Sequence, residues 1–181
     1  MADDAIEALA PPAPGLGVLS AALDAHFRGA MRQTASGVTV IATDGRAGRE
    51  GVTVSTFCSL SLEPPSVIAC ISRTSRCLPV LMENGAFVAN VLAEDQSDVA
   101  AIFAGHVDVP RQARFEAGRW STLVTGSPVL ERAVANFDCR LATSFDFGSH
   151  RIVIGVIADV VQQHEARPLL FSDRRFRRME G

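Results

Sequence analysis

The chain has 181 residues, of which 48% are hydrophobic and 20% are charged. This length predicts one domain with a sizeable core, and the composition argues against disorder along most of the chain. A formal net charge of −3 gives no support to nucleic-acid binding. The longest apolar stretch, residues 152–158, is too short to span a bilayer. Because the acidic N-terminus also lacks the features of a secretory signal, we expect a cytoplasmic protein without a nucleic-acid or membrane partner.

The N-terminal part predicts a tail followed by a helix. Residues 1–19 are rich in Ala, Pro and Gly and are expected to form a flexible tail, so that residues 20–181 form the single domain. Ser20 is a suitable N-cap for a helix that runs to about Gln33. The predicted apolar face of this helix consists of Leu23, Phe27, Ala30 and Met31.

Short β-strands dominate the pattern after this helix. Residues 38–43 predict a strand, Asp44 and Gly45 predict a hairpin turn, and residues 51–65 predict a second strand that a double proline closes. The later elements are predicted to be strands at 66–72 and 87–92, helices at 74–83 and 96–104, mostly irregular chain at 105–128, and a long hairpin over 134–162. At least six short strands with few helices favour a closed or nearly closed antiparallel barrel. A doubly wound sheet is rejected, because it would need strands and helices to alternate regularly and because the only Gly-x-Gly motif lies in the tail.

The stretch 51–65 is the first candidate for a binding surface. As one strand, it would place on one face Thr53, Ser55, Phe57, Ser59 and Ser61. The other face would carry Val54, Thr56, Cys58, Leu60 and Leu62. We expect the second, nearly apolar face to belong to the core. The hydroxyls of the first face suit a planar heterocycle with carbonyl and imide groups, and a solvated strand face explains the same residues.

Residues 72–76, Ser-Arg-Thr-Ser-Arg, are the second candidate. They leave a predicted strand and enter a predicted helix, where backbone amides, hydroxyls and guanidinium groups together would bind a phosphate. A polar surface loop explains the same residues, because all 17 basic side chains of the chain are arginines.

Cysteine and histidine spacing predicts no metal site. The four cysteines contain no Cys-x-x-Cys pair, which argues against a zinc site or a redox dithiol; they are Cys58, Cys70, Cys77 and Cys139. We expect them to be buried, reduced thiols. Three histidines lack a partner at metal-ligand spacing: His26, His106 and His164.

Several motifs also occur in a characteristic order along the chain. Residues 34–41 read Thr-Ala-Ser-Gly-Val-Thr-Val-Ile, and residues 51–65 contain Thr-Val-Ser-Thr-Phe-Cys-Ser before Pro-Pro. Residues 87–92 and 148–150 continue the pattern. Over about residues 25–178, the sequence resembles the flavin reductase-like family, the short-chain split-barrel NAD(P)H:flavin oxidoreductases that act as reductase components of two-component flavin monooxygenases. The resemblance implies an FMN-binding split β-barrel that is mainly β, with a few helices and antiparallel Greek-key connections.

The resemblance also implies which residues would contact the flavin. The isoalloxazine ring and the ribityl chain would be lined by Thr53, Val54, Ser55, Thr56, Cys58 and Ser59. Asn90 and Ala104 would lie near the flavin.

Two further groups follow from the resemblance. Ser72, Arg73 and Ser75 would hold the flavin phosphate. His150 would lie beside the nicotinamide, although Ser149 stands where the family has Asp.

The resemblance implies FMN or FAD as the flavin and NADH or NADPH as the co-substrate. Because the hydride passes between the two cofactors, no catalytic side chain and no metal is required. A homodimer is expected, with a separate monooxygenase that receives the reduced flavin. The alternatives are a flavin-dependent corrinoid reductase and a flavin- or haem-binding split-barrel protein without turnover. The arginine-rich residues 174–178 would meet a nucleotide phosphate, an acidic patch of a partner, or only solvent.

Overall fold

The computed structural model describes residues 20–179, so the predicted flexible tail, residues 1–19, lies outside the described residues. The chain divides into two compact units, Met1–Thr34 and Ala35–Gly181, and each is described by itself. Among residues 20–179, none of the helices combines the length and the apolar character needed to cross a membrane.

Helix α1 (Ala21–Gln33) forms where the sequence predicts a helix. The backbone N–H of Leu23 donates to Ser20 Oγ over 3.3 Å, so Ser20 is the N-cap. The predicted apolar face is exposed in the single chain, with exposed fractions of 51%, 58% and 52% for Leu23, Phe27 and Met31. Isolated helices of this length are marginal in water, so this face needs a packing partner to be stable.

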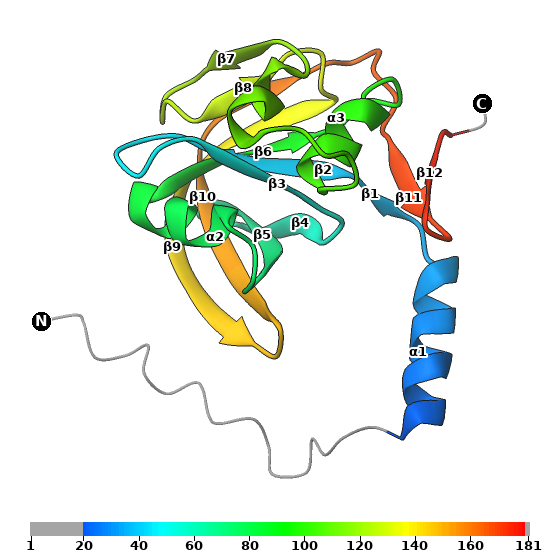
Figure 1. Cartoon of the computed structure of the whole chain (residues 1–181). Coiled ribbons are helices and arrows are strands. Elements are labelled where there is room, and N and C mark those ends of the chain that lie inside the picture. Colours follow the sequence, from blue (N-terminus) through cyan, green and yellow to red (C-terminus); the bar gives the residue numbers. More distant parts are fainter. Residues whose placement is uncertain (1–19, 180–181) are drawn as a thin grey trace, which may run out of the picture. The chain divides into compact units, whose positions relative to one another are not determined.

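Most of the second unit is one antiparallel sheet of seven strands (Figure 1). In sheet order the strands are β3 (Glu50–Val54), β2 (Thr39–Thr43), β6 (Ala86–Val91), β9 (Ala135–Phe147), β10 (His150–Gln162), β5 (Pro65–Ser72) and β4 (Phe57–Leu62). The smaller sheets are made of β1 (Ser36–Gly37), β11 (Leu170–Ser172) and β12 (Arg175–Arg177), and of β7 (Trp120–Thr122) and β8 (Pro128–Leu130). The helices of this unit are α2 (Cys77–Asn84), α3 (Ser97–Phe103) and the 3-10 helix η1 (Arg111–Glu116). The predicted class, mainly β and antiparallel with a few helices, is confirmed.

The strands at the two ends of the large sheet, β3 and β4, follow each other directly in the chain. Only Ser55 and Thr56 connect them, so the sheet has to curl until its two edges approach each other at this corner. In the part of the chain that the structure describes, β3 and β4 share no ladder of hydrogen bonds, and a seam runs between them. The barrel is therefore split at this seam and not closed.

The sheet is buried on both faces along its central strands. One hydrophobic cluster contains Ile41 and Phe87, and a second contains Val40 and Leu92, so neighbouring residues of β2 belong to different clusters. A Cβ atom at Gly155 of β10 would lie 2.6 Å from Cζ of Phe87. Glycine at this position therefore lets the Phe87 ring pack directly against the backbone of the sheet.

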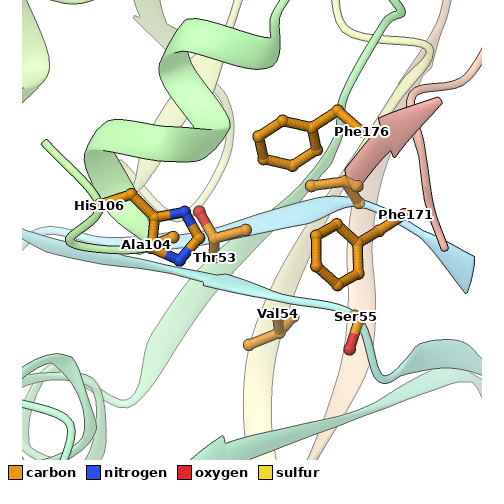
Figure 2. Close-up of a pocket in the computed structure, with 8 residues that line it drawn as sticks. Thr53, Val54, Ser55, Ala104, His106, Phe171 and Phe176 are labelled. Carbon is orange, nitrogen blue, oxygen red and sulfur yellow. The ribbon is translucent and has the colours of Figure 1, made fainter. Parts of the chain in front are cut away.

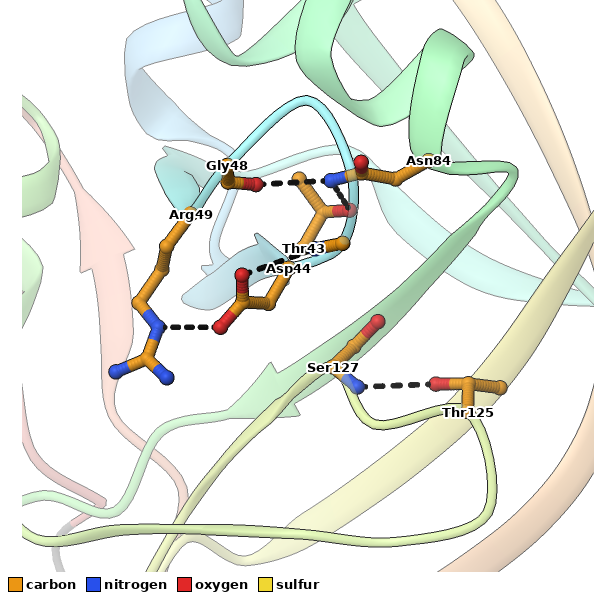
Figure 3. Close-up of polar contacts among 8 residues, drawn as sticks. Thr43, Asp44, Gly48, Arg49, Asn84, Thr125 and Ser127 are labelled. Carbon is orange, nitrogen blue, oxygen red and sulfur yellow. Dashed lines mark hydrogen bonds and ion pairs between the residues drawn. The ribbon is translucent and has the colours of Figure 1, made fainter.

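The predicted turn at Asp44 and Gly45 is held from outside by Asn84, the last residue of α2 (Figure 3). Asn84 Nδ2 donates to the carbonyl of Gly48 over 3.0 Å and to Thr43 Oγ1 over 3.1 Å. Asn84 Oδ1 accepts from the backbone N–H of Ala47 over 2.9 Å. These bonds fix where β3 begins, and thereby where it reaches the seam.

The prediction of one continuous strand over residues 51–65 is wrong. In one continuous strand, Val54 and Phe57 would face opposite sides, because they are three residues apart. The corner at Ser55 and Thr56 breaks this alternation. Val54 and Phe57 both pack on the first cluster, whereas the exposed fractions of Leu60 and Leu62 are 48% and 84%. The expected apolar core face therefore ends at Val54.

The prediction of buried thiols holds for two of the four cysteines. Cys77 and Cys139 are buried, and burial raises the pKa of both thiols to about 12. Cys70 is half-buried and Cys58 is exposed. The prediction is wrong for Cys58 because it lies on β4, which ends the sheet.

Candidate functional site

A cavity of about 150 Å³ lies where β3 reaches the corner (Figure 2). Its lining joins segments that are far apart in the sequence, namely Val38, Thr53, Val54, Ser55, Ala104, His106, Phe171 and Phe176. Four predicted flavin-site residues are among them: Thr53, Val54, Ser55 and Ala104. The fold thus brings the end of β3 next to the end of α3 and the β11–β12 hairpin.

Two phenylalanines form one wall of this cavity. Phe171 and Phe176 are register partners on β11 and β12, with ring centroids 5.7 Å apart and planes inclined by 62°. In Figure 2 both rings lie on one side of the cavity and His106 lies on the other. None of these three residues is among the predicted site residues. The hairpin turns at Asp173 and Arg174, both at positive φ, and this pair is not a usual turn signal in a sequence.

The hydroxyl groups in the lining differ in their availability to a ligand. Thr53 Oγ1 donates to the carbonyl of Ala100 over 2.8 Å, which attaches β3 to α3. Ser55 is exposed, and its hydroxyl has no protein partner among residues 20–179. Ser55 is therefore the lining hydroxyl that can both donate to a ligand and accept from it, whereas Thr53 Oγ1 can only accept.

Three predicted residues lie beside the cavity and do not line it. Thr56 belongs to the corner, while Cys58 and Ser59 are on β4, and all three are exposed. They reach a ligand only where that ligand extends over the seam.

Asn90 is buried in the core and does not line the cavity. Its side chain is 0% exposed, and its Nδ2 donates to the carbonyl of Val40 over 3.1 Å. Its Oδ1 accepts from the backbone N–H of Leu130 and from Asn136 Nδ2, each over 2.8 Å. These bonds join β2, β6, β8 and β9 inside the core and give Asn90 a structural role, while the expectation that it lies near the flavin stays a prediction.

The Ser72–Ser75 segment forms a tight turn after β5. The backbone N–H of Ser75 donates to the carbonyl of Ser72 over 2.9 Å, and Ser72 Oγ lies 2.9 Å from Thr74 Oγ1. Ser75 Oγ accepts from the backbone N–H of Cys77 over 3.3 Å, at the start of α2. The hydroxyls of Ser72 and Ser75 and the exposed Arg73 thus belong to one turn, and their role in binding a phosphate stays a prediction.

His150 lies next to this turn, although it is far away in the sequence. Ser72 and His150 are register partners on β5 and β10, and the backbone N–H of Arg73 donates to the carbonyl of Ser149 over 3.0 Å. His150 is exposed, and its Nδ1 lies 2.9 Å from Ser149 Oγ. The residues predicted for the phosphate and for the nicotinamide are therefore neighbours.

The turn and the cavity flank the same corner of the barrel. The backbone N–H of Cys70 donates to the carbonyl of Thr56 over 3.2 Å, so the corner meets β5 near its end. Ser72 follows two residues later, which is about 7 Å along a strand. One extended ligand can therefore lie along both features.

These features fit a flavin better than a compact ligand. An apolar cavity suits the ring system, and a turn with hydroxyls and a guanidinium group suits the phosphate at the other end. Ligand pockets usually have volumes of about 300–1,000 Å³. Because the cavity has only about 150 Å³, it is too small in a single chain for a whole flavin ring system.

The comparison with protein families places almost the whole second unit in one family. The family model described as "Flavin reductase like domain" matches residues 31–180. The chain belongs to the flavin reductase-like domain family, which confirms the resemblance and the class of enzyme predicted from the sequence.

The FMN reductase (NADH) RutF of Variovorax paradoxus is 39% identical over 152 residues, which cover 84% of this chain and 83% of the relative. The NADH:FAD oxidoreductase of Streptomyces globisporus was solved in complex with NAD and FAD fragments. Its structure matches with a TM-score of 0.80 at 27% identity, and the match covers 90% of this chain and 96% of the oxidoreductase chain. The flavin reductase component of a bacterial two-component tryptophan halogenase matches with a TM-score of 0.79 at 30% identity. This match covers 87% of this chain and 99% of the reductase chain.

Proposed function

We propose that this chain reduces FMN with NADH. The observation that carries the proposal is the apolar cavity at the seam together with the Ser72–Ser75 turn, because the two features match the two ends of one flavin mononucleotide. The choice of FMN and NADH is supported by the relative named FMN reductase (NADH). FAD and NADPH are the alternatives, and the relative solved with NAD and FAD fragments supports the first of them.

In this proposal the cavity binds the flavin ring. Phe171 and Phe176 provide the apolar wall, and the backbone and hydroxyl of Ser55 provide hydrogen bonds at the ring's polar edge. Thr56 and Ser59 contact the parts of the flavin that extend over the seam. Oriented N–H and O–H donors at this edge stabilise the negative charge of a reduced ring.

The other half of the site binds the charged groups. Arg73 binds the phosphate with the help of Ser72 and Ser75, and His150 contacts the nicotinamide. When bound, the flavin supplies the hydride-accepting chemistry, so the side chains need only bind, orient and exclude water.

We further propose that the site is completed by a second copy of the chain. One chain encloses only about 150 Å³, and the edge strand β4 presents Leu60 and Leu62 with exposed fractions of 48% and 84%. Exposed apolar side chains on an unpaired edge strand are typical of an interface. Light scattering coupled to size exclusion, on the wild type and on Leu62→Glu, tests this: a dimer that the variant weakens supports it, and a wild-type monomer contradicts it.

The reduced flavin is proposed to serve a separate monooxygenase. Support comes from the structural relative that is the flavin reductase of a styrene monooxygenase from Pseudomonas putida. Exposed residues at the seam, such as Cys58 and Ser59, leave a path along which a flavin can exit.

Anaerobic mixing of the purified protein with NADH and excess FMN tests the function. Loss of the visible flavin absorbance at many equivalents per protein supports the reductase. A bound chromophore that NADH leaves unchanged contradicts it and favours a binding protein without turnover. Flavin bleaching is also expected of a corrinoid reductase, so a cob(II)alamin acceptor is then added, and its reduction by the reduced flavin distinguishes this alternative.

A further inference from the structure

The guanidinium group of Arg73 is bound to the tip of the β9–β10 hairpin. Arg73 Nη1 donates to the carbonyl of Gly148 over 3.3 Å, and Arg73 Nε lies 3.5 Å from Asp146 Oδ2. The residue proposed to bind a phosphate therefore already has a carboxylate beside it.

Asp146 is shared between two arginines. Arg151, its register partner on β10, donates from Nε to Asp146 Oδ1 over 2.5 Å. This hydrogen bond is the main reason why the pKa of Asp146 lies below its usual range. The 3.5 Å contact to Arg73 is longer than the 2.7–2.9 Å of a strong charged hydrogen bond, so Arg73 is held loosely.

The surrounding charges make Asp146 the relevant anion. An open groove of about 630 Å³ is lined by Arg73, Leu78, Pro79, Met82, Glu83, Asp146 and Arg151. Glu83, the other carboxylate in this lining, pairs with Arg46 at 3.6 Å. Within the described residues, Asp146 is thus the carboxylate that contacts Arg73.

We propose that Asp146 is an internal competitor for the flavin phosphate: its carboxylate occupies Arg73, and Arg151 limits how strongly it does so. This inference rests on the proposed function, in which Arg73 binds the phosphate. A phosphate monoester carries close to two negative charges at neutral pH and accepts two parallel hydrogen bonds from a guanidinium group. It therefore displaces the single, loosely held carboxylate, which stays bound to Arg151.

The consequence concerns how tightly the flavin is held. Exposed ion pairs contribute little, the equivalent of a factor of about 2 to 5 in an equilibrium constant. A competitor of this strength weakens the binding of the flavin without abolishing it. Asp146 thus favours a flavin that exchanges as a substrate over one that stays bound.

The test compares FMN with riboflavin, which has the same ring and no phosphate. For Asp146→Asn, we expect the Kd of FMN, measured by fluorescence quenching, to fall about two- to fivefold, while the Kd of riboflavin stays within twofold. Glu83→Gln is the matched control, because it removes the same charge from the same groove without freeing Arg73. An equal effect of Glu83→Gln, or an equal gain for riboflavin, would overturn the proposal.

A second variant separates the role of Arg151 from direct phosphate binding. Arg151→Gln removes the hydrogen bond from Arg151 to Asp146, so Asp146 can pair more strongly with Arg73. The Kd of FMN should therefore rise about twofold in the wild-type background. In the Asp146→Asn background the same change should have no effect on FMN. If it weakens FMN there as well, Arg151 contacts the phosphate itself and the proposal fails.

The proposed function and the proposed competition can fail separately. If the wild type neither binds FMN nor bleaches it with NADH, the proposed function is wrong. If the wild type binds FMN and the Kd ratio of FMN to riboflavin is unchanged by Asp146→Asn, only the competition is wrong. Thermal unfolding of each variant shows whether the hairpin tip has remained intact.

Discussion

The two halves of the candidate site carry different kinds of side chain, mainly apolar in the cavity and charged at the turn and the hairpin tip. The cavity at the seam is lined by Val54, Phe171 and Phe176, whereas the turn and the hairpin tip carry Arg73 and Asp146 with side-chain exposed fractions of 54% and 36%. The first half recognises shape by excluding water, and the second recognises charge in the presence of water. Affinity in the first half should therefore be insensitive to salt, while affinity in the second should fall as salt rises.

The largest expected effect lies at Asn90, which belongs to neither half. Asn90→Ala should lower the free energy of unfolding by about 2–4 kcal/mol, because it leaves buried donors and acceptors unpaired. Urea unfolding measures this loss, and the FMN affinity of the folded protein should stay within twofold. A stable variant with weak FMN binding would return Asn90 to the site.

Phe176→Ala removes part of the apolar wall. We expect the Kd of FMN and that of riboflavin to rise by the same factor, about tenfold, since both ligands carry the ring. Fluorescence titration at low and high salt should give the same factor. A loss confined to FMN would mean that the ring binds elsewhere.

Arg73→Gln should act on the other half. The Kd of FMN is expected to rise about fivefold at low salt and less at high salt, whereas the Kd of riboflavin stays the same. Arg76→Gln is the control, because Arg76 is an exposed arginine of the same segment. Equal losses in both variants would show that only the overall charge matters.

His150→Gln should weaken the binding of NADH and leave the binding of the flavin unchanged. The KM for NADH is expected to rise about threefold, and the Kd of FMN should be unchanged, since His150 is exposed at the hairpin tip outside the cavity lining. Steady-state kinetics with varied NADH measures the first quantity. A changed Kd of FMN with an unchanged KM would reverse this assignment.

The smallest expected effect compares two serines. Ser55→Ala should raise the Kd of FMN and that of riboflavin about two- to threefold, because Ser55 lines the cavity and its hydroxyl is free to form a hydrogen bond with a ligand. Ser59→Ala should change either Kd by less than twofold, because Ser59 lies on β4 beside the cavity. The opposite order would place the ring over the outer part of the seam.

Local signals predicted much of the fold. The N-cap Ser20, the turn at Asp44 and Gly45, and the long hairpin that turns near Gly148 each depend on a few neighbouring residues, and all are found in the structure. The corner after Val54 was not predictable in the same way. Thr, Ser and Phe continue a strand pattern through it, and only the curling of the whole sheet requires the break.

The candidate site divides in the same manner. Thr53, Val54 and Ser55 carry a recognisable motif, whereas His106 and Phe176 have no local feature that separates them from ordinary loop and strand residues. The polar Asn90 has no such feature either. Its burial depends on three strands that are remote in the sequence.

By itself the sequence determined the strand-rich class, the first helix and the segments that carry polar chemistry, because periodicity, caps and turns act over a few residues. The tertiary structure decided which of those segments meet. Curling of the sheet brings β3 and β4 to the two-residue corner beside the cavity, and pairing β5 with β10 brings Arg73 to Asp146. These contacts join residues far apart in the chain, and their stability comes from burying the sheet as a whole and not from any local preference.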